Sequence, residues 1–352
     1  MKKHTLVALA ALTATAGAMA QSSVTLFGVV DASIARVSAG GNDVTGLSSG
    51  GLSSSRLGFR GAEDLGGGLS ASFWLEGGLA VDNGGSGFKF DRRSTVSLSS
   101  KSIGELRLGR DKSPAYLNVE TFDPFGDSGV GGINGANLIG SASSAVGTAE
   151  GSAPKRFSNS IGYVAPNLGG FYGQFAYSFG EEASSIANDR KKSGIALRAG
   201  YGAGPLNVAL GYGQSRGGTD AVGVDYKSTN IGASYNFGMV KPMVLFATEK
   251  GGNKRVDLFA VGATVPLGAG ELRASYAMFK DKKLSNADSK KLALGYGYNL
   301  SKRTQLYATV ARMTNDDGAK RGLAVSSSSL ASPTIASGAN VTGYEFGVRH
   351  SF

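Results

Sequence analysis

The chain has 352 residues, a formal net charge of +10, 55 glycines, two histidines and no cysteine. The lack of cysteine excludes disulfide scaffolds and cysteine-ligated zinc sites, and eight prolines without a regular glycine period exclude a collagen-like chain. Hydrophobic residues make up 41% and charged residues 18%, a balance typical of a folded protein rather than a disordered one.

Residues 1–20 have the pattern of a secretory signal peptide. Lys2 and Lys3 form a positive start, residues 6–12 are apolar, and residues 18–20 read Ala-Met-Ala, as before a cleavage site. The apolar run is too short to span a bilayer. We therefore expect export and a mature chain of residues 21–352 that forms one domain. Loss of Lys2 and Lys3 lowers the formal charge by two, from +10 to +8.

Apolar and polar residues alternate in short segments throughout the rest of the chain, for example over 24–34, 69–76, 171–179 and 291–299. This period of two predicts strands with one wet and one dry face. No later segment approaches the roughly 18 continuous apolar residues of a membrane helix. The same result is expected of an outer-membrane barrel, because its lipid-facing and lumen-facing residues alternate along each strand.

Short turns alternate with longer polar connections, among them residues 37–53, 77–89 and 314–339. Counting the segments between these connections gives about 16 strands, an even number that is typical of bacterial outer-membrane barrels. The sequence therefore predicts an all-β fold, a transmembrane antiparallel β-barrel of about 16 strands. A soluble sandwich of amphipathic strands shows the same alternation and stays open at this point.

One connection, the predicted third loop at about residues 111–155, is exceptionally long. Loops of more than about 15 residues are usually functional or disordered. Phe122, Pro124 and Phe125 lie in this segment and offer apolar anchors for packing. Since a barrel of about 16 strands is wide enough for an aqueous channel, we expect the loop to fold into the lumen and narrow it. A loop that stays at the surface is the alternative.

The last ten residues, GYEFGVRHSF, read as a closing strand. Tyr344, Phe346, Val348 and His350 share one face with the terminal Phe352, and the other face is charged or small. A strand that ends on an aromatic residue and has one apolar face suits a barrel wall between lipid and water. Phe352 is therefore the predicted terminal signal of the barrel.

Six stretches carry a family resemblance: SSVTLFGVVDA (22–32), SRLGFRGAEDLGGGL (55–69), FDRRSTVSLS (90–99), LRLGR (106–110), KRFSNSIGYVAPNLGGFYG (155–173) and the terminal GVRHSF. Taken together and in this order, they resemble the general-diffusion porins of beta-proteobacteria. The resemblance covers essentially the whole chain. It implies a homotrimer of 16-stranded barrels in the outer membrane of a Gram-negative bacterium, with the third loop folded into each pore. It also implies passive diffusion of small hydrophilic solutes and ions, often with a preference for anions.

The resemblance also places a pore constriction. Its predicted basic side comprises Arg56, Arg60, Arg92, Arg93 and Arg156, and its predicted acidic side, on the loop, comprises Glu120, Asp123 and Asp127. The family's FxRQAYVGL reads FDRRSTVSL here. Alternation with Val96 and Leu98 predicts that Arg93 points inward, whereas the motif position assigns that role to Arg92, so both stay candidates. Arginine suits the role because its guanidinium group stays ionised and is weakly hydrated.

An enzyme is disfavoured because the mature chain has no cysteine and only one histidine, His350, so the usual nucleophilic and metal-binding arrangements lack their residues. No cofactor, metal or nucleic-acid partner is expected. Two alternatives to general diffusion stay open, a channel specific for a dicarboxylate or phosphate and a structural or adhesive barrel that does not conduct. Basic residues at the predicted external strand ends suit outer-leaflet lipopolysaccharide as a partner, and ordinary solvated loop charge is the alternative that stays open. They include Arg190, Lys191, Lys192, Lys250, Lys254, Arg255, Lys282, Lys283, Lys290 and Lys291.

Overall fold

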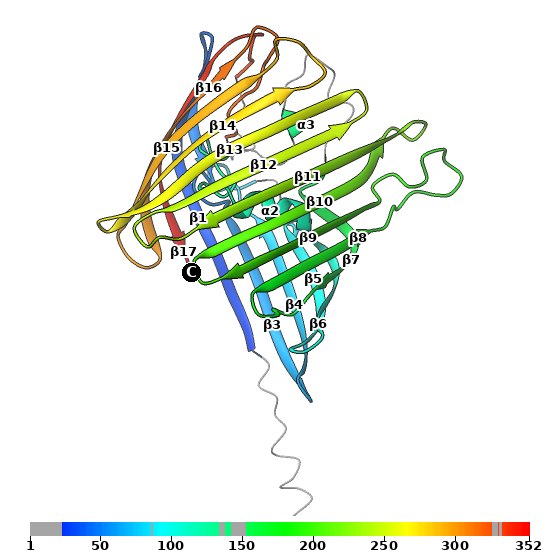
Figure 1. Cartoon of the computed structure of the whole chain (residues 1–352). Coiled ribbons are helices and arrows are strands. Elements are labelled where there is room, and N and C mark those ends of the chain that lie inside the picture. The colour runs from blue at the N-terminus through cyan, green and yellow to red at the C-terminus, as the bar shows by residue number, and fades with distance from the viewer. Residues whose placement is uncertain (1–22, 86, 134–137, 142–152, 326–329, 331–332) are drawn as a thin grey trace, which may run out of the picture.

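The computed structural model describes residues 23–85, 87–133, 138–141, 153–325, 330 and 333–352. The predicted signal peptide, residues 1–20, lies outside the described residues. Within the described ranges the chain forms one antiparallel sheet of seventeen strands. Figure 1 shows that this sheet curves round into a barrel of tilted strands. The strands are β1 (Ser23–Ala39), β2 (Asn42–Ser49), β3 (Arg56–Gly66), β4 (Leu69–Gly78), β5 (Arg93–Ser100), β6 (Gly104–Lys112), β7 (Arg156–Val164), β8 (Phe171–Ser178), β9 (Gly194–Ala203), β10 (Leu206–Gly218), β11 (Gly223–Tyr235), β12 (Lys241–Gly251), β13 (Lys254–Leu267), β14 (Gly270–Asp281), β15 (Ser289–Asn299), β16 (Thr304–Asn315) and β17 (Val341–Ser351).

The barrel closes because its first strand pairs with its last. The register of β1 and β17 runs from Val29 opposite Ser351 to Ala39 opposite Val341. At the seam, the amide of Phe352 donates to the carbonyl of Gly28 at 3.1 Å, and the amide of Gly28 donates back to Phe352 at 3.0 Å. This pairing removes the free edges that the first and last strands would otherwise expose, as a membrane-spanning sheet requires.

Two of the seventeen strands occupy one position in the barrel. The first part of β1 pairs with β3, and its second part pairs with β2. β2 and β3 therefore lie end to end along β1, separated by an excursion over residues 50–55 that we call the wall excursion. Since the two halves share one position, sixteen strands surround the barrel, and the predicted strand number is confirmed.

The prediction of a long polar connection over 37–53 is wrong. β1 continues to Ala39 and β2 begins at Asn42, so the turn between them is tight. Its two residues, Gly40 and Gly41, have φ angles of 58° and 93°. A two-residue hairpin turn of this kind needs positive φ values, which glycine adopts without strain.

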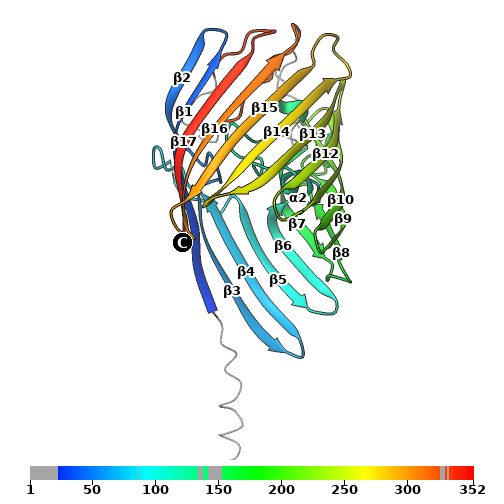
Figure 2. The same cartoon turned by 60° about the vertical axis from the view of Figure 1, so that its left-hand side comes forward.

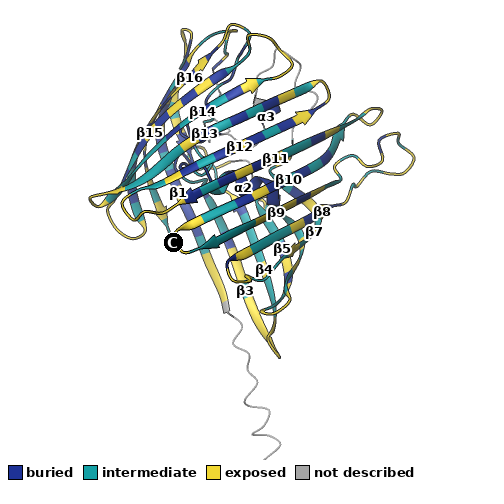
Figure 3. Ribbon diagram, viewed as in Figure 1, coloured by how far each residue is buried: buried dark blue, intermediate teal, exposed yellow. Residues whose placement is uncertain are grey.

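Side chains alternate between two faces along the strands, as Figure 3 shows by burial. On β1, Val24 and Ile34 are 67% and 59% exposed on the outer face, whereas Asp31 and Ala35 on the other face are fully buried. An apolar outer face and a more polar inner face are the pattern of a barrel wall in a membrane. None of the described helices is long and apolar enough to cross a membrane.

The segment between β6 and β7, residues 113–155, is the third loop. It contains α2 (Pro114–Thr121) and α3 (Leu138–Ser141). Ser113 caps α2, because its hydroxyl accepts from the amide of Tyr116 at 3.2 Å, and Pro114 occupies the first turn. α2 packs against β8, β9, β10 and β11, and Figure 2 shows it within the ring of strands.

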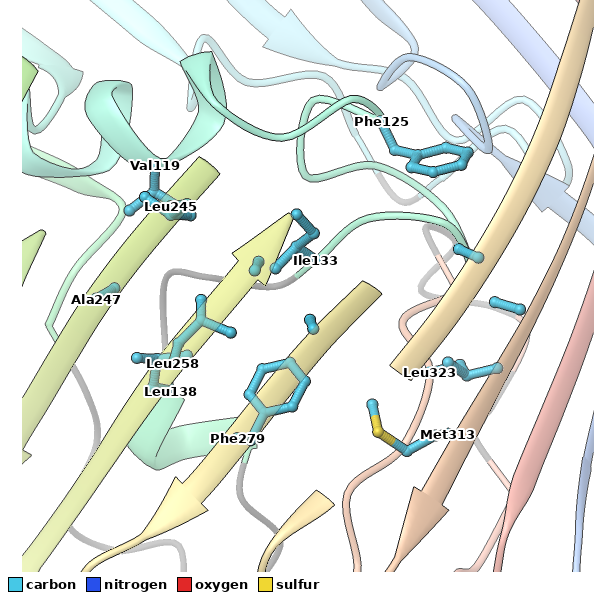
Figure 4. Close-up of a cluster of buried hydrophobic side chains, with 14 of the residues drawn as sticks. Val119, Phe125, Ile133, Leu138, Leu245, Ala247, Leu258, Phe279, Met313 and Leu323 are labelled. Atoms are coloured by element: carbon cyan, nitrogen blue, oxygen red, sulfur yellow. The ribbon is translucent and has the colours of Figure 1, made fainter. Parts of the chain in front are cut away.

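The apolar anchors of the third loop pack onto inward-facing residues of the wall. Phe122 and Phe125 are only 1% and 4% exposed. They belong to a buried cluster in which loop residues contact β12 to β16, and Figure 4 shows several of its members. The labelled side chains are Val119, Phe125, Ile133 and Leu138 of the loop with Leu245, Ala247, Leu258, Phe279, Met313 and Leu323. This core lies on the side of the wall opposite the exposed hydrophobic residues.

Candidate functional site

A cavity of about 810 Å³ lies between the third loop and the inner face of the wall. The wall excursion contributes Leu52, Ser53 and Ser54 to its lining. The basic lining residues number nine: Arg56, Arg92, Arg93, Arg107, Lys112, Arg156, Lys241, Arg273 and Arg349. The acidic ones number five: Glu76, Asp111, Glu120, Asp123 and Glu271. The cavity is therefore rich in charge of both signs, with a basic excess.

Six of the eight predicted constriction residues line this cavity. On the basic side they are Arg56, Arg92, Arg93 and Arg156, and on the loop side Glu120 and Asp123. Arg60 and Asp127 are not among the lining residues. Arg60 shares the inner face of β3 with Arg56 but lies closer to the turn that follows the strand.

Near that turn, the guanidinium group of Arg60 contacts two aromatic rings. Its guanidinium carbon lies 5.3 Å from the centre of the Phe27 ring and 5.2 Å from that of Trp74. Such cation–π contacts stabilise a guanidinium group by roughly 0.5–1 kcal/mol at exposed sites. Arg60 is exposed, so its charge is accessible to solvent and ions.

Both Arg92 and Arg93 face the cavity. β5 begins only at Arg93, so Arg92 precedes the regular alternation, and its Nε donates to Glu76 Oε1 at 2.7 Å. Arg93 lies over the Trp74 ring at 4.6 Å and 3.7 Å from Asp111 Oδ2. Two consecutive residues of one strand would point to opposite faces. Arg92 and Arg93 reach the same cavity because Arg92 lies outside β5.

The three loop carboxylates have structural partners. Glu120 accepts from Lys112 Nζ at 2.6 Å, and Asp127 accepts from Lys155 Nζ at 2.5 Å and from the Tyr116 hydroxyl at 3.0 Å. These bonds tie the loop to itself and to the end of β6. The carboxylates predicted for the acidic side of the constriction therefore also stabilise the conformation of the loop.

Asp123 organises the backbone of the loop after α2. It accepts from the amides of Phe125, Asp127 and Ile133 at 2.9, 3.0 and 2.7 Å. Burial, reinforced by the neighbouring Asp127 carboxylate, raises the pKa of Asp123 to about 6. A small pH change within the ordinary range therefore changes the charge of this cavity.

Most lining arginines are matched by a carboxylate, and two are not. Arg107 pairs with Glu105 and Asp111, and Arg273 pairs with Glu271. Arg156 and Arg349 form no ion pair with any carboxylate in the described part of the chain. Arg156 uses its Nε to donate to the carbonyl of Arg92 at 2.8 Å. Its terminal nitrogens are therefore the clearest positive charge that the constriction offers to a solute.

Some lining residues escaped the sequence prediction of the constriction. Alternation alone places Arg107, Arg273 and Arg349 on inner faces, but nothing in the sequence distinguishes them from ordinary wall residues. Ser53 and Ser54 reach the cavity only because β2 and β3 are interrupted. The one available signal for that interruption is the pair of glycines at 50 and 51, of which Gly50 has a positive φ of 84°.

The chain is similar in sequence and in structure to known porins. Residues 8–318 match the profile of the Gram-negative porin family. The chain is 40% identical to outer membrane porin protein 32 of Delftia acidovorans over 359 aligned positions, which cover 99% of this chain and 100% of the relative. Its structure resembles that of an anion-selective porin from Comamonas acidovorans, with 38% identity, a TM-score of 0.85, and 94% and 100% of the two chains covered. The trimer form of OmpT from Vibrio cholerae is similar in fold, with 17% identity, a TM-score of 0.65, and 94% and 99% of the two chains covered.

Proposed function

This chain belongs to the Gram-negative porin family and is an outer-membrane channel protein, and from that premise we propose that its pore prefers small anions. The observation that carries the proposal is the lining of the 810 Å³ cavity, where nine basic residues face five acidic ones. A basic excess in a narrow aqueous passage raises the local concentration of anions and lowers that of cations.

Three lining cations that have no ion-pair partner among the described residues, Arg156, Lys241 and Arg349, supply the uncompensated part of this field. A guanidinium group that already binds a carboxylate presents little net charge to a passing ion, because the pair is nearly neutral from a distance. Arg156 lacks such a partner within the described residues and is only partly exposed, so its field is weakly screened by bulk water. The similar Comamonas protein is described as anion-selective, which supports the proposal.

We further propose that the third loop narrows the channel. It packs onto β8–β16 on one side of the barrel, and its free side faces the basic residues of β3–β7. Solutes would then pass between Glu120 and Asp123 on the loop and Arg56, Arg92, Arg93 and Arg156 on the wall. The field there is transverse to the path, so both signs of charge on a zwitterion can be accommodated while the net excess favours anions.

Reversal potentials in planar bilayers under a KCl gradient test the anion preference. We expect chloride to be more permeant than potassium, and the preference to shrink at 1 M salt, where the Debye length is about 3 Å instead of about 10 Å at 0.1 M. Arg156→Gln should lower the chloride-to-potassium permeability ratio by about twofold or more. The matched control is Arg190→Gln, which removes the same charge from an exposed loop residue that does not line the cavity. A cation-preferring wild type, or a barrel that does not conduct, would overturn the proposal.

We also propose that the barrel assembles as a homotrimer. The support is the membership of the porin family together with the trimer form described for the similarly folded OmpT of Vibrio cholerae. The mass of the detergent-purified protein, measured by light scattering with the detergent contribution subtracted, should equal three chains. A mass of one chain under conditions that preserve conductance would contradict the trimer.

Outer-leaflet lipopolysaccharide is the proposed lipid partner, and the structure changes which residues would bind it. Lys291, predicted at the rim, is instead 1% exposed, and its Nζ donates inward to the carbonyl of Gly132. The outward face carries a different feature. Lys227 lies opposite Lys250, and Lys250 lies opposite Arg255, on three consecutive strands.

We call Lys227, Lys250 and Arg255 the outer basic row. All three alternate with inward-facing buried residues, so they point away from the lumen. Like charges directly opposite on neighbouring strands destabilise a sheet. Arg255 pairs with Asp257 at 3.0 Å, which offsets one of the three charges. The phosphate groups of lipopolysaccharide would offset the others, which is the physical reason for proposing this lipid.

A further inference from the structure

A second cavity of about 550 Å³ lies beside the main one, toward the loops that follow β8 and β10. We call it the side pocket. Its lining comes from the end of the third loop, the start of β7, the end of β8 and the loop that follows it, the end of β10 and the start of β11. Arg156 lines both the side pocket and the main cavity. The two cavities are therefore adjacent, and they share one guanidinium group.

The floor of the side pocket is apolar and well packed. Phe157 is 4% exposed and packs against Ala115, Ala176 and Ala196, and Tyr226 is 2% exposed. The ring of Tyr226 lies directly against Gly217, so closely that a side chain at that position would overlap it. Because these rings are held by packing before any ligand arrives, the pocket is preformed. A volume of about 550 Å³ is within the usual range for small-molecule sites.

Three basic residues line the side pocket, and two of them are paired with carboxylates. Lys192 pairs with Glu182 at 3.2 Å, and Arg216 pairs with Asp225 at 3.0 Å. Within the described residues Arg156 forms no ion pair with a carboxylate, and its side-chain hydrogen bond, to the carbonyl of Arg92, uses Nε. Its two terminal nitrogens can therefore hold a carboxylate in the bidentate manner that guanidinium groups favour.

The apolar floor and the one lining guanidinium group that has no carboxylate partner among the described residues together define a ligand. We propose that the side pocket binds a small aromatic carboxylate, with its ring against Phe157 and Tyr226 and its carboxylate on Arg156. A bound molecule would lie next to the constriction and share its arginine, so it would be held there before it enters the main cavity. This inference rests on the proposed anion-preferring pore for the passage of the ligand but not for its binding.

Benzoate is the probe, and acetate is the control that has the carboxylate without the ring. We expect benzoate to reduce the chloride current of the reconstituted protein in a saturable manner at millimolar concentration, and acetate at equal concentration to leave it nearly unchanged. Saturation-transfer NMR on the detergent-purified protein, which needs no conductance, should show transfer to the benzoate ring protons. Equal effects of benzoate and acetate would overturn the role of the aromatic floor.

Two variants with opposite expected effects test the location. Ser158→Phe adds a ring at an exposed lining position and should fill the pocket, lowering benzoate affinity at least fivefold with the chloride current kept. Glu181→Gln removes the only carboxylate that lines the pocket within the described residues, and should raise benzoate affinity about two- to threefold. Because this second change affects an exposed residue, it guards against a misfolded first variant.

The outcomes separate the inference from the proposed function. Benzoate binding that is unchanged in both variants would overturn the side pocket as its site, even if chloride remains the more permeant ion. Benzoate binding that follows the two variants supports the pocket, even if the KCl reversal potential shows no anion preference. In that second case the proposed anion-preferring pore fails and the binding site stands.

Discussion

Single buried carboxylates hold the inner surface of this barrel in shape. Asp31 is fully buried on β1, and its Oδ2 accepts from the amides of Leu52 and Ser53 at 3.0 and 2.7 Å, while Oδ1 accepts from the Tyr307 hydroxyl at 2.6 Å. Glu345 on β17 accepts from the amide of Val130 in the third loop at 3.1 Å. The wall excursion and the third loop are thus held in place through hydrogen bonds from their backbone amides, which do not depend on particular side chains in those segments.

Removing Asp31 should loosen the wall excursion. In Asp31→Ala, two amides and one hydroxyl lose a charged acceptor, and each lost hydrogen bond to a charged group costs about 1.5–3 kcal/mol. Since Leu52 and Ser53 line the main cavity, we expect larger current fluctuations in single-channel recordings and a lower temperature of thermal denaturation. Asp31→Asn keeps a carbonyl acceptor and should lie between the variant and the wild type. A quiet channel with unchanged stability in Asp31→Ala would contradict this account.

Asp123 should make the selectivity of the pore sensitive to pH. Its pKa of about 6 is raised from the ordinary value of 3.8 by burial, so the group is ionised at pH 7.5 and protonated at pH 5. Protonation removes one negative charge from the cavity lining. We therefore expect the chloride-to-potassium permeability ratio to increase between pH 7.5 and pH 5.

The raised pKa of Asp123 also determines how this group affects the stability of the folded state as the pH changes. Folding disfavours the ionised form of Asp123, so this group destabilises the folded state above pH 6, and the effect is lost as the pH falls through 6 toward 4. Mild acid should therefore not loosen the loop through Asp123. Asp123→Asn is the control, because its reversal potential should change less between pH 7.5 and pH 5 than that of the wild type. An equal change in the variant would assign the pH effect to other groups.

The direction in which a single residue faces can be predicted where that residue lies in a regular strand. Alternation correctly predicts that Arg56 and Arg93 face inward, because β3 and β5 have an unbroken period of two at those positions. It cannot place Arg92, which precedes its strand. It also cannot show that Lys291 is buried rather than at the rim, because the partner of Lys291 is a backbone carbonyl of the third loop, 159 residues away.

At the scale of elements, the third loop is held by packing along its length. Phe122 is 1% exposed, and its ring fills the space that the missing side chain of Gly232 leaves on β11. The predicted aromatic anchors of the loop are buried, since a long segment inside a barrel can be fixed only where it covers apolar wall residues. Which wall strands it contacts could not be predicted, because those contacts join residues far apart in the chain, such as Asn118 and Ala209, which are 91 positions apart.

Phe122→Ala should release this part of the loop. Truncating a buried phenylalanine typically costs 3–5 kcal/mol through lost burial and the cavity left behind. We expect single-channel recordings to show a larger mean conductance or frequent substates, with the strands intact by circular dichroism. The matched control is Phe246→Ala, which removes the same atoms from an outward-facing ring that is 50% exposed. Identical conductance in both variants would show that the anchor does not set the width of the pore.

Strand number could be predicted from the sequence, whereas the interruption of one strand could not. Sixteen positions follow from counting turns, because every hairpin needs its turn residues. The wall excursion between β2 and β3 restarts the alternation after residue 55, so the sequence reads as a polar connection over 37–53 although most of that range is strand. β1 pairs with both β2 and β3, and this strand pairing cannot be read from the local sequence pattern.

For the whole molecule, the formal charge of +8 that remains without Lys2 and Lys3 is carried in part by two separate groups of basic residues. Part of it lines the cavity, where nine basic residues exceed five acidic ones by four. Another part lies on the outer face in Lys227, Lys250 and Arg255, which point toward the outside of the barrel. The two sets face opposite sides of one wall, so their roles can be tested independently by substitution.

The outer basic row should make the stability of the assembly depend on lipopolysaccharide. In the triple variant Lys227→Gln, Lys250→Gln, Arg255→Gln, we expect the increase in denaturation temperature on adding lipopolysaccharide to fall by at least half, because each cation near an anionic lipid surface contributes about 1 kcal/mol. The matched control replaces three exposed cations at the short-turn end of the barrel, Lys101, Lys302 and Arg303, with glutamine. Chloride selectivity should stay the same in both triple variants, since none of the six residues lines the cavity. If both lose the lipid effect equally, net charge rather than the row is responsible, and if neither loses it, the lipid binds elsewhere.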